Sequence, residues 1–429
     1  MLTTQSLLEA ARAAHSRLAP FRASRQRFKR FTFGSQWDDR MLTPSGAQMT
    51  EGDYAARNGR VPLTNNMIQR LVKTLVGHWR NSVADRNSPT EELDARALEE
   101  FLISGCAVQR VEGGEVENVC PDDFFVSDFR RPDGADIELV GMVHRLSPTQ
   151  LLARFAGGSR QQAAEIRRHY SADDPADARA AAARRCLVYE VWTLEPAERL
   201  RCSDTHTGAT FLAPADREAE LCERNRRRAR RKVKPLRWTY ECATQWVQRF
   251  LSPAGMLLGE RTAGRHPFAV RFYPLLDGEV HPFVEGLIDQ QKYVNRLITL
   301  IDNMMSTSAK GVLLFPENEM ISQMEWKDVQ ELWASYDGVI PYNPRPDSPG
   351  PRQIVTNSSN SGAYELLNLQ MQLFQQISGV SSALRGDHDS GGNSAQLFDA
   401  QTRNSLAAQA DLFRTFDSFL AQRDSLMKQ

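Results

Sequence analysis

The last third of the chain, from Glu285 to Gln429, carries an ordered series of segments that limits the folds open to it. The series begins with a long amphipathic helix, passes through an insert that contains Trp and Pro residues, and returns through a second helix. A short loop rich in Gly, Ser and Asp then leads to a third helix. Two helices with apolar stripes that flank an insert lack an evident partner in one copy, so the pattern favours several copies packed side by side in a ring.

The first helix is predicted to begin after Pro282 and to end near Thr307, which gives it a length of roughly 37 Å. Its apolar residues recur every seven positions, and such a narrow stripe suits packing of helix on helix. The second helix is predicted over 364–378. The stripes predict an interface between neighbouring copies at Leu287, Val294, Ile298, Ile301 and Met305 of the first helix and at Leu373 and Phe374 of the second.

The insert, residues 310–360, is predicted to form a separate small α/β module. Strands are expected at 312–315, 339–340 and 353–355, and a helix at 325–334. Several prolines stiffen the link between the last two strands.

The loop from Ser381 to Ser394 admits three interpretations. A phosphate-binding P-loop is excluded, because no Lys follows Gly391 in the stretch that begins at Gly386. A metal site at 387–389 is weak, because adjacent side chains rarely converge on one ion, and no metal or cofactor is predicted. The third interpretation is a mobile loop that approaches DNA without holding it, since it neutralises few phosphates.

The third helix, 395–429, has an apolar face and no Gly or Pro stop before the last residue. We therefore expect the natural protein to continue beyond Gln429. At the other end of the chain, residues 1–60 are predicted to form a basic helix over 7–29 and a polar connector. Together these would make an arm that lies on the surface or on a neighbouring copy.

The region 61–281 is predicted to be an α+β domain. A helix begins near Met67 and is expected to break near Gly77, and Ser147 is expected to cap another helix. Strands with a period of two are predicted at 108–111, 124–126, 140–144, 187–192, 238–241, 246–251 and 268–273.

A basic run, 224–237, lies within this domain and contains nine Lys or Arg residues. One interpretation is a nucleic-acid surface. The other, which we favour from the sequence, is a solvated and poorly ordered excursion between two strands. Trp238 and Tyr240 follow at strand spacing and are expected to pack inward.

Composition narrows the functional classes. The chain has 429 residues with 53 basic and 53 acidic side chains, so the net charge does not favour a protein that coats DNA tightly. No apolar run approaches the length of a membrane span and no signal peptide is evident, so the chain is most simply intracellular. The six cysteines are scattered without a CxxC pair, and their spacing matches no common zinc pattern.

The order of these parts resembles the portal proteins of tailed double-stranded DNA bacteriophages and related prophages. The resemblance rests on short motifs that together span about four-fifths of the chain: Leu63-Thr64-Asn65-Asn66, Phe101-Leu102-Ile103-Ser104-Gly105, Val119-Cys120-Pro121-Asp122-Asp123-Phe124, Gly286-Leu287-Ile288-Asp289-Gln290-Gln291 with Asn295, Ile377-Ser378-Gly379-Val380, and Ser394-Ala395 with Gln401.

The resemblance implies an α+β portal subunit of several domains. Its parts would be an α+β wing at 61–281, stem helices at 282–309 and 361–380, a small α/β clip at 310–360, a tunnel loop at 381–394 and a long wing helix at 395–429. It implies a ring of twelve subunits at one capsid vertex, made in the host cytoplasm, without catalytic residues. Double-stranded DNA passes through the channel, and a large terminase, the major capsid protein and a head-tail adaptor are the partners. The DNA-facing residues would be Arg385, Asp387, His388, Asp389, Ser390 and Asn393, and the docking residues of the clip would be Trp326, Trp333 and Tyr342.

Two alternatives remain open at this point. An enzyme that acts on nucleic acid, such as the packaging motor, would need a Walker A sequence or clustered acidic metal ligands, and neither is present. A different head-tail connector or a DNA-binding adaptor would use the basic run 224–237 as its main surface.

Overall fold

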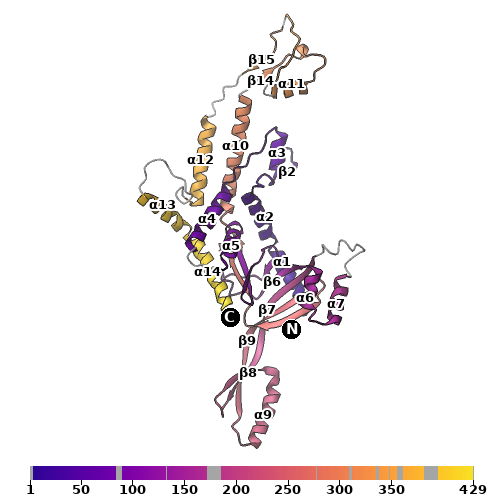
Figure 1. Ribbon diagram of the computed structural model, residues 1–429, viewed down its shortest axis with the longest axis vertical. Helices are drawn as coiled ribbons and strands as arrows, with labels where there is room; N and C mark the ends of the chain where they lie inside the picture. Colours follow the sequence, from indigo (N-terminus) through magenta and orange to yellow (C-terminus); the bar gives the residue numbers. More distant parts are fainter. Residues whose placement is uncertain are drawn as a thin grey trace. The chain divides into compact units, whose positions relative to one another are not determined.

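The computed structural model describes residues 3–83, 89–131, 133–171, 185–276, 278–308, 312–334, 338–346, 348–354, 361–380 and 395–428. The chain divides into two compact units (Figure 1). Unit 1 comprises residues 1–26, 76–282 and 410–429, and unit 2 comprises residues 27–75 and 283–409. Helices and strands are mixed, which confirms the predicted α+β class.

Unit 1 is built on an antiparallel sheet of six strands. Its strand order is β10-β9-β7-β6-β5, and β8 pairs with β7 beside this path. The strands are β5 (Phe124–Val126), β6 (Leu139–Leu146), β7 (Cys186–Asp204), β8 (Thr210–Pro214), β9 (Leu236–Leu251) and β10 (Leu257–Ala263). The two strands predicted at 238–241 and 246–251 form a single strand, β9, because it pairs with β7 over its whole length.

A second sheet in unit 1 has the order β11-β3-β4, with β3 at Cys106–Glu112, β4 at Glu115–Asn118 and β11 at Phe268–Phe272. Apolar side chains of both sheets share one core, in which Phe124 and Phe268 meet with ring centroids 5.9 Å apart. The helix before β3, α5 (Glu91–Ser104), ends at Gly105, whose φ is +70°. Glycine is required here, because a Cβ atom would lie 2.5 Å from the carbonyl oxygen of Tyr273.

The first helix, α1 (Thr4–Arg17), belongs to the core of unit 1. Leu7, Leu8, Ala11 and Ala14 are buried against apolar residues of the large sheet such as Val191. The apolar face of α1 therefore covers the large sheet of unit 1. The basic helix predicted over 7–29 is divided at Leu18, after which α2 (Ala19–Phe33) begins.

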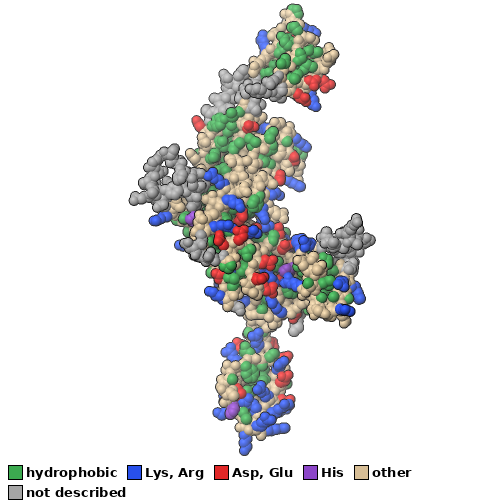
Figure 2. Space-filling model, viewed as in Figure 1, with side chains coloured by type: hydrophobic (Ala, Val, Ile, Leu, Met, Phe, Trp, Pro, Cys, Tyr) green, Lys and Arg blue, Asp and Glu red, His purple; other side chains and the backbone are tan. Residues whose placement is uncertain are grey.

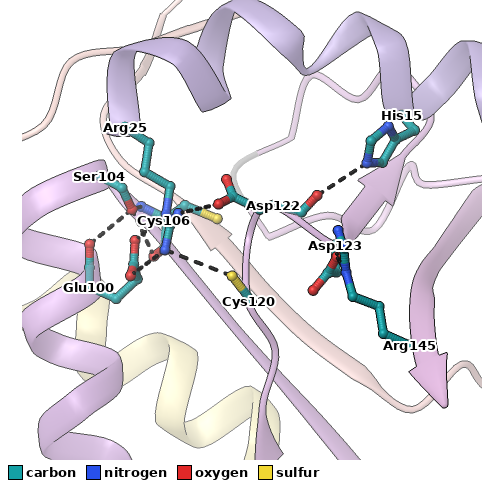
Figure 3. Close-up of polar contacts among 9 residues, drawn as sticks. All are labelled: His15, Arg25, Glu100, Ser104, Cys106, Cys120, Asp122, Asp123 and Arg145. Carbon is teal, nitrogen blue, oxygen red and sulfur yellow. Dashed lines mark hydrogen bonds and ion pairs between the residues drawn. The ribbon is translucent and has the colours of Figure 1, made fainter. Parts of the chain in front are cut away.

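Arg25 of α2 fixes this helix to the rest of unit 1 through ionic contacts (Figure 3). Its Nε lies 2.6 Å from Oε1 of Glu100 in α5, and its Nη1 lies 2.9 Å from Oδ2 of Asp122. His15 of α1 contacts the backbone oxygen of Asp122 at 3.1 Å. The motif 119–124 thus anchors both N-terminal helices, which gives it a structural role.

The remaining elements of unit 1 surround these sheets. They include α6 (Pro148–Phe155), α7 (Arg160–Ser171), α9 (Glu218–Arg230), the short strands β12 (Leu275–Leu276) and β13 (Glu279–Val280), and α14 (Ala410–Met427). Ser147 caps α6 in a capping box with Gln150, as predicted.

The predicted third helix is two helices, α13 (Ala395–Ala408) and α14, and they are separated at Gln409. The side chain of Gln409 donates a hydrogen bond of 2.9 Å to the backbone oxygen of Ser378 within unit 2. The sequence pattern predicted one continuous helix and did not indicate this break between α13 and α14.

Unit 2 contains the helices that the sequence predicted most clearly. A 3-10 turn (Glu285–Leu287) leads into α10 (Ile288–Ser308), and α12 (Ser361–Ser378) packs beside α10 (Figure 1). The inserted module between them has β14 (Val312–Leu314), α11 (Trp326–Ala334) and β15 (Arg352–Ile354). No strand forms at the described residues 339–340, where one was predicted.

The N-terminal part of unit 2 includes a short hairpin, β1 (Arg40–Leu42) with β2 (Gln48–Thr50), and α3 (Glu51–Arg57). The helix α4 (Met67–Val83) begins in unit 2 and ends in unit 1. It continues through Gly77 without the predicted break, since an isolated glycine in a helix costs only about 1 kcal/mol relative to alanine.

Candidate assembly and nucleic-acid surfaces

The seven-residue seam that runs from the 3-10 turn into α10 is covered within its own chain. Leu287 is 1% exposed, Val294 is 0% exposed and Ile301 is 6% exposed. Phe374 of α12 is also buried, and α12 packs on α10. We predicted that neighbouring copies hide Leu287, Val294, Ile301 and Phe374, and this prediction is wrong because all four are buried within one copy. The periodicity of a sequence identifies an apolar face but does not identify what covers it.

A row of buried polar side chains also lies on α10, at intervals of four residues. Gln291 donates a 2.6 Å hydrogen bond to the backbone oxygen of Asn65, and Asn295 accepts one of 3.0 Å from its N–H. Thr299 accepts another from the N–H of Leu63 at 3.0 Å. The backbone of the motif 63–66 is thereby satisfied by one helix face. The motif 63–66 and the polar row of α10, which lie more than 200 residues apart in the chain, are thus joined by hydrogen bonds.

Charged side chains add a second connection between α10 and the N-terminal part of unit 2. Lys292 Nζ lies 2.7 Å from Asp39 Oδ2 and 2.8 Å from Glu51 Oε1. Arg296 Nη2 lies 2.8 Å from Glu51 Oε2. Burial alone would raise the pKa of Asp39, but the hydrogen bonds from Lys292 and Arg27 lower it below its ordinary value. The polar side of α10 is therefore also engaged within the chain.

The sides of α10 and α12 that remain open carry apolar residues. Ile298 and Leu373, both from the predicted interface, are half-buried, and Met305 is 50% exposed. On α12, Leu369 and Ile377 are each 49% exposed. Leu369, Leu373 and Ile377 follow each other at four-residue intervals, so they form one stripe along the helix.

In the inserted module, the three residues of the predicted docking surface differ in exposure. Trp326 is 44% exposed and Tyr342 is 43% exposed, while Trp333 is half-buried. The ring of Trp326 meets that of Phe315 edge to face, with centroids 6.3 Å apart. Val339 is 79% exposed nearby in the sequence, so this small module presents an unusual amount of apolar surface.

The predicted DNA-facing residues Arg385, Asp387, His388, Asp389, Ser390 and Asn393 lie outside the described residues. Elsewhere, across the part of the chain that the structure describes, no group of three or more His, Cys, Asp or Glu side chains is placed to hold a metal ion. The six cysteines are free thiols. None of the described helices is long and apolar enough to cross a membrane.

One carboxylate is fully buried in the large sheet of unit 1. Glu190 Oε1 accepts hydrogen bonds from Trp192 at 2.9 Å, Gln248 at 2.7 Å and Arg110 at 3.2 Å, while Oε2 lies 2.6 Å from His144 Nε2. Burial alone would raise the pKa of Glu190, but the hydrogen bond with His144 and the charge of Arg110 lower it to about 2. Because the carboxylate is 0% exposed, the cluster joins four strands, β3, β6, β7 and β9, rather than offering a reactive group.

The basic run 224–237 is ordered, contrary to the interpretation that we favoured from the sequence. Its first half belongs to the helix α9, and Leu221 of this helix is buried in a small core with Leu200 and Leu236. Trp238 packs against the same core, whereas Tyr240 is 59% exposed, so the inward packing predicted for this pair is correct only for Trp238.

We compared the sequence with known proteins and protein families. A search of curated proteins finds no match. The model of the phage P22-like portal protein family matches residues 117–423, which is more than half of the chain and includes most of unit 1, α10, the inserted module and α12. The matched region includes the order of helix, insert and helix described above. Because the match covers more than half of the chain, the chain belongs to the phage P22-like portal protein family.

Proposed function

We propose that this protein forms a ring of twelve subunits at one vertex of a phage capsid, with a channel through which double-stranded DNA is packaged and ejected. The observation that carries the proposal is the family match over residues 117–423. Membership implies a structural, non-enzymatic protein with DNA and capsid partners. We infer that the ring assembles in the host cytoplasm and contacts the major capsid protein. Electron microscopy of the purified protein tests the proposal, and a strictly monomeric particle at all concentrations and in assembled heads would overturn it.

Contacts between subunits in the ring are proposed at the open stripe of α12 and the open side of α10. The stripe Leu369, Leu373 and Ile377 supports this, because a monomer that left it in water would expose apolar surface that association can bury. Ile298 and Met305 add apolar surface on α10.

Replacing Leu369 and Ile377 by Asp tests this interface. The double variant should remain folded, because both side chains are half exposed, and native mass spectrometry should show monomers instead of rings. Leu212→Asp is the matched control, since Leu212 is an equally exposed leucine of unit 1. Rings formed by the double variant at the same concentration as the wild type would contradict the assignment.

For the loop 381–394 we propose contact with DNA in the channel, as the residue types between Arg385 and Asn393 suggest. One cation and two anions among small polar residues allow weak contact with a moving duplex, since few counterions are released. Deleting 385–393 should abolish packaging and leave the ring intact by electron microscopy. Normal packaging by rings with the shortened loop would refute this role.

The inserted module is proposed to dock the large terminase and, after packaging, the head-tail adaptor. Exposed aromatic side chains such as Trp326 and Tyr342 are typical anchors of protein interfaces. Replacing both by Ala should weaken terminase binding to the ring by at least about tenfold, since hot-spot aromatics contribute about 2 kcal/mol or more. Binding of unchanged affinity in surface plasmon resonance would exclude these residues as the anchor.

A further inference from the structure

The strands β7 and β9 form a long hairpin whose distal half has its own small core. The register runs without interruption from Tyr189↔Leu251 to Asp204↔Leu236. The distal half is joined by β8, and α9 lies beside it (Figure 1). Leu221 of α9 packs with Leu200, Cys202, Ala213 and Leu236. The hairpin, β8 and α9 therefore make a folded subdomain within unit 1, which we call the hairpin subdomain (196–244).

Polar contacts fix the direction in which α9 faces. Asn225 both accepts from the N–H of Leu236 at 2.7 Å and donates to its backbone oxygen at 2.9 Å. Arg228 forms a bidentate pair with Asp204, with distances of 3.0 and 2.5 Å. Leu221, Asn225 and Arg228 recur at helical spacing, so they define the packed face. The opposite face of the helix is left to solvent.

The exposed surface of α9 and the turn after it are strongly basic. Arg224, Arg226, Arg230, Arg231, Lys232 and Lys234 are all exposed, and none has an ion pair among the residues that the structure describes. Figure 2 shows blue Lys and Arg side chains gathered over the α9 end of the hairpin subdomain. The acidic residues of α9 lie toward its start, and Glu223 is already paired with Arg227 at 2.6 Å. The cations at the end of the helix are therefore not neutralised locally.

The composition of this surface favours a phosphate-rich partner over a protein. No exposed large apolar residue occurs between 222 and 237 in this described stretch, whereas the centre of a protein interface is rich in aromatic and apolar residues. Lys232, in the turn after α9, takes a left-handed conformation with φ of +53°, where glycine is favoured.

We propose that the end of α9 and the turn that follows it bind the phosphate backbone of double-stranded DNA without sequence specificity. Six unpaired cations lie within eleven consecutive residues, 224–234, so they form one local positive surface although the whole chain has zero net charge. Each phosphate contact releases counterions and contributes about 0.9 to the slope of log K against log salt. This surface is an addition to the channel loop: it lies in unit 1 and would act whether or not that loop touches DNA.

The test replaces Arg224, Arg226 and Arg230 by Gln in the full chain and measures binding of a fluorescent 30-base-pair duplex by anisotropy. If all three contact phosphate, the salt slope of the variant should be smaller by about 2 to 3. The ratio of wild-type to variant affinity should then shrink about 40-fold between 50 and 200 mM salt. Folding is checked by circular dichroism and ring formation by electron microscopy, both of which should be unchanged because these side chains hold nothing in place.

The matched control replaces Arg160, Arg167 and Arg168 of α7 by Gln, which removes the same charge from another exposed helix of unit 1. The control should keep the wild-type salt slope. A slope that is equal in the wild type and the α9 variant overturns the proposal, as does absence of duplex binding by the wild type. Binding of poly-glutamate with higher affinity than the duplex at equal charge concentration also overturns it, and would assign the surface to an acidic protein instead.

Discussion

The buried carboxylate of Glu190 allows a prediction about stability that can be worked out from its contacts. Its pKa in the folded protein is lowered from an ordinary value of 4.5 to about 2, and the unfolded chain restores the ordinary value. Because the folded state holds the proton less tightly, the ionised carboxylate stabilises the fold above pH 5, and this stabilisation is lost as the pH falls toward 2. A shift of about 2.5 units corresponds to about 3 kcal/mol of unfolding free energy.

Replacing Glu190 by Gln removes the charge and leaves the size of the side chain nearly unchanged. At pH 7 the variant should be less stable than the wild type by about 3 kcal/mol, because Arg110 then keeps a buried charge with one carboxylate partner fewer. At pH 3 the difference should fall to about 1 kcal/mol, because the unfolded chain then binds a proton at this carboxylate while the folded chain mostly does not. Urea unfolding followed by circular dichroism at both pH values measures the two differences.

Glu115→Gln serves as the control, because Glu115 is exposed on β4 and its loss should change stability by less than about 0.5 kcal/mol at either pH. Other titrating carboxylates affect both proteins equally, so they cancel in the comparison. A Glu190→Gln difference that stays constant between pH 7 and pH 3 would refute the assignment of the buried charge.

Three further results are expected. Arg423→Ala should lower the free energy of unfolding in urea by about 3 to 5 kcal/mol, because it leaves the buried Asp94 without its ionic partner. The double variant Asp94→Leu with Arg423→Met should recover most of this loss, since it removes both buried charges. An equal loss in the two variants would show that the unpaired charge is not the cause. Lys232→Gly should stabilise the last turn of α9 by about 1 kcal/mol, because glycine adopts the left-handed backbone without strain. Backbone hydrogen exchange in that turn should therefore become slower. Faster exchange would show that the left-handed backbone of Lys232 carries no strain. Gly141→Ala should destabilise unit 1 strongly or prevent folding, because its Cβ would lie 2.0 Å from the backbone oxygen of Glu190, so an unchanged melting temperature would contradict the close strand contact.

The elements with a strong local period were predictable from the sequence. The helix α11 was expected within one residue of its observed start, and α12 within three, because their apolar residues recur at helical spacing. The strands β5 and β6 were found for the corresponding reason, since short apolar runs between turn residues indicate buried strands.

The failures of prediction share a physical cause, which is that local pattern does not identify tertiary partners. The sequence predicted α1 as part of a basic arm, and its pattern did not identify the large sheet on which Leu7, Leu8 and Ala11 pack. The helix α9 was missed because arginines dominate it and only Leu221 is buried. The polar residues Gln291, Asn295 and Thr299 recur every four positions in the sequence. On an otherwise apolar helix, this spacing indicates a row of polar side chains on one face.

The covered seam of α10 has a consequence for how the proposed ring would assemble. Since Leu287, Val294 and Ile301 already have cover inside the subunit, folding need not wait for a second copy. A cell could accumulate a pool of finished subunits whose association is governed by concentration and by whatever nucleates the vertex. The apolar stripe of α12 and the open side of α10 would then drive association, so the timing of assembly would be set separately from the success of folding.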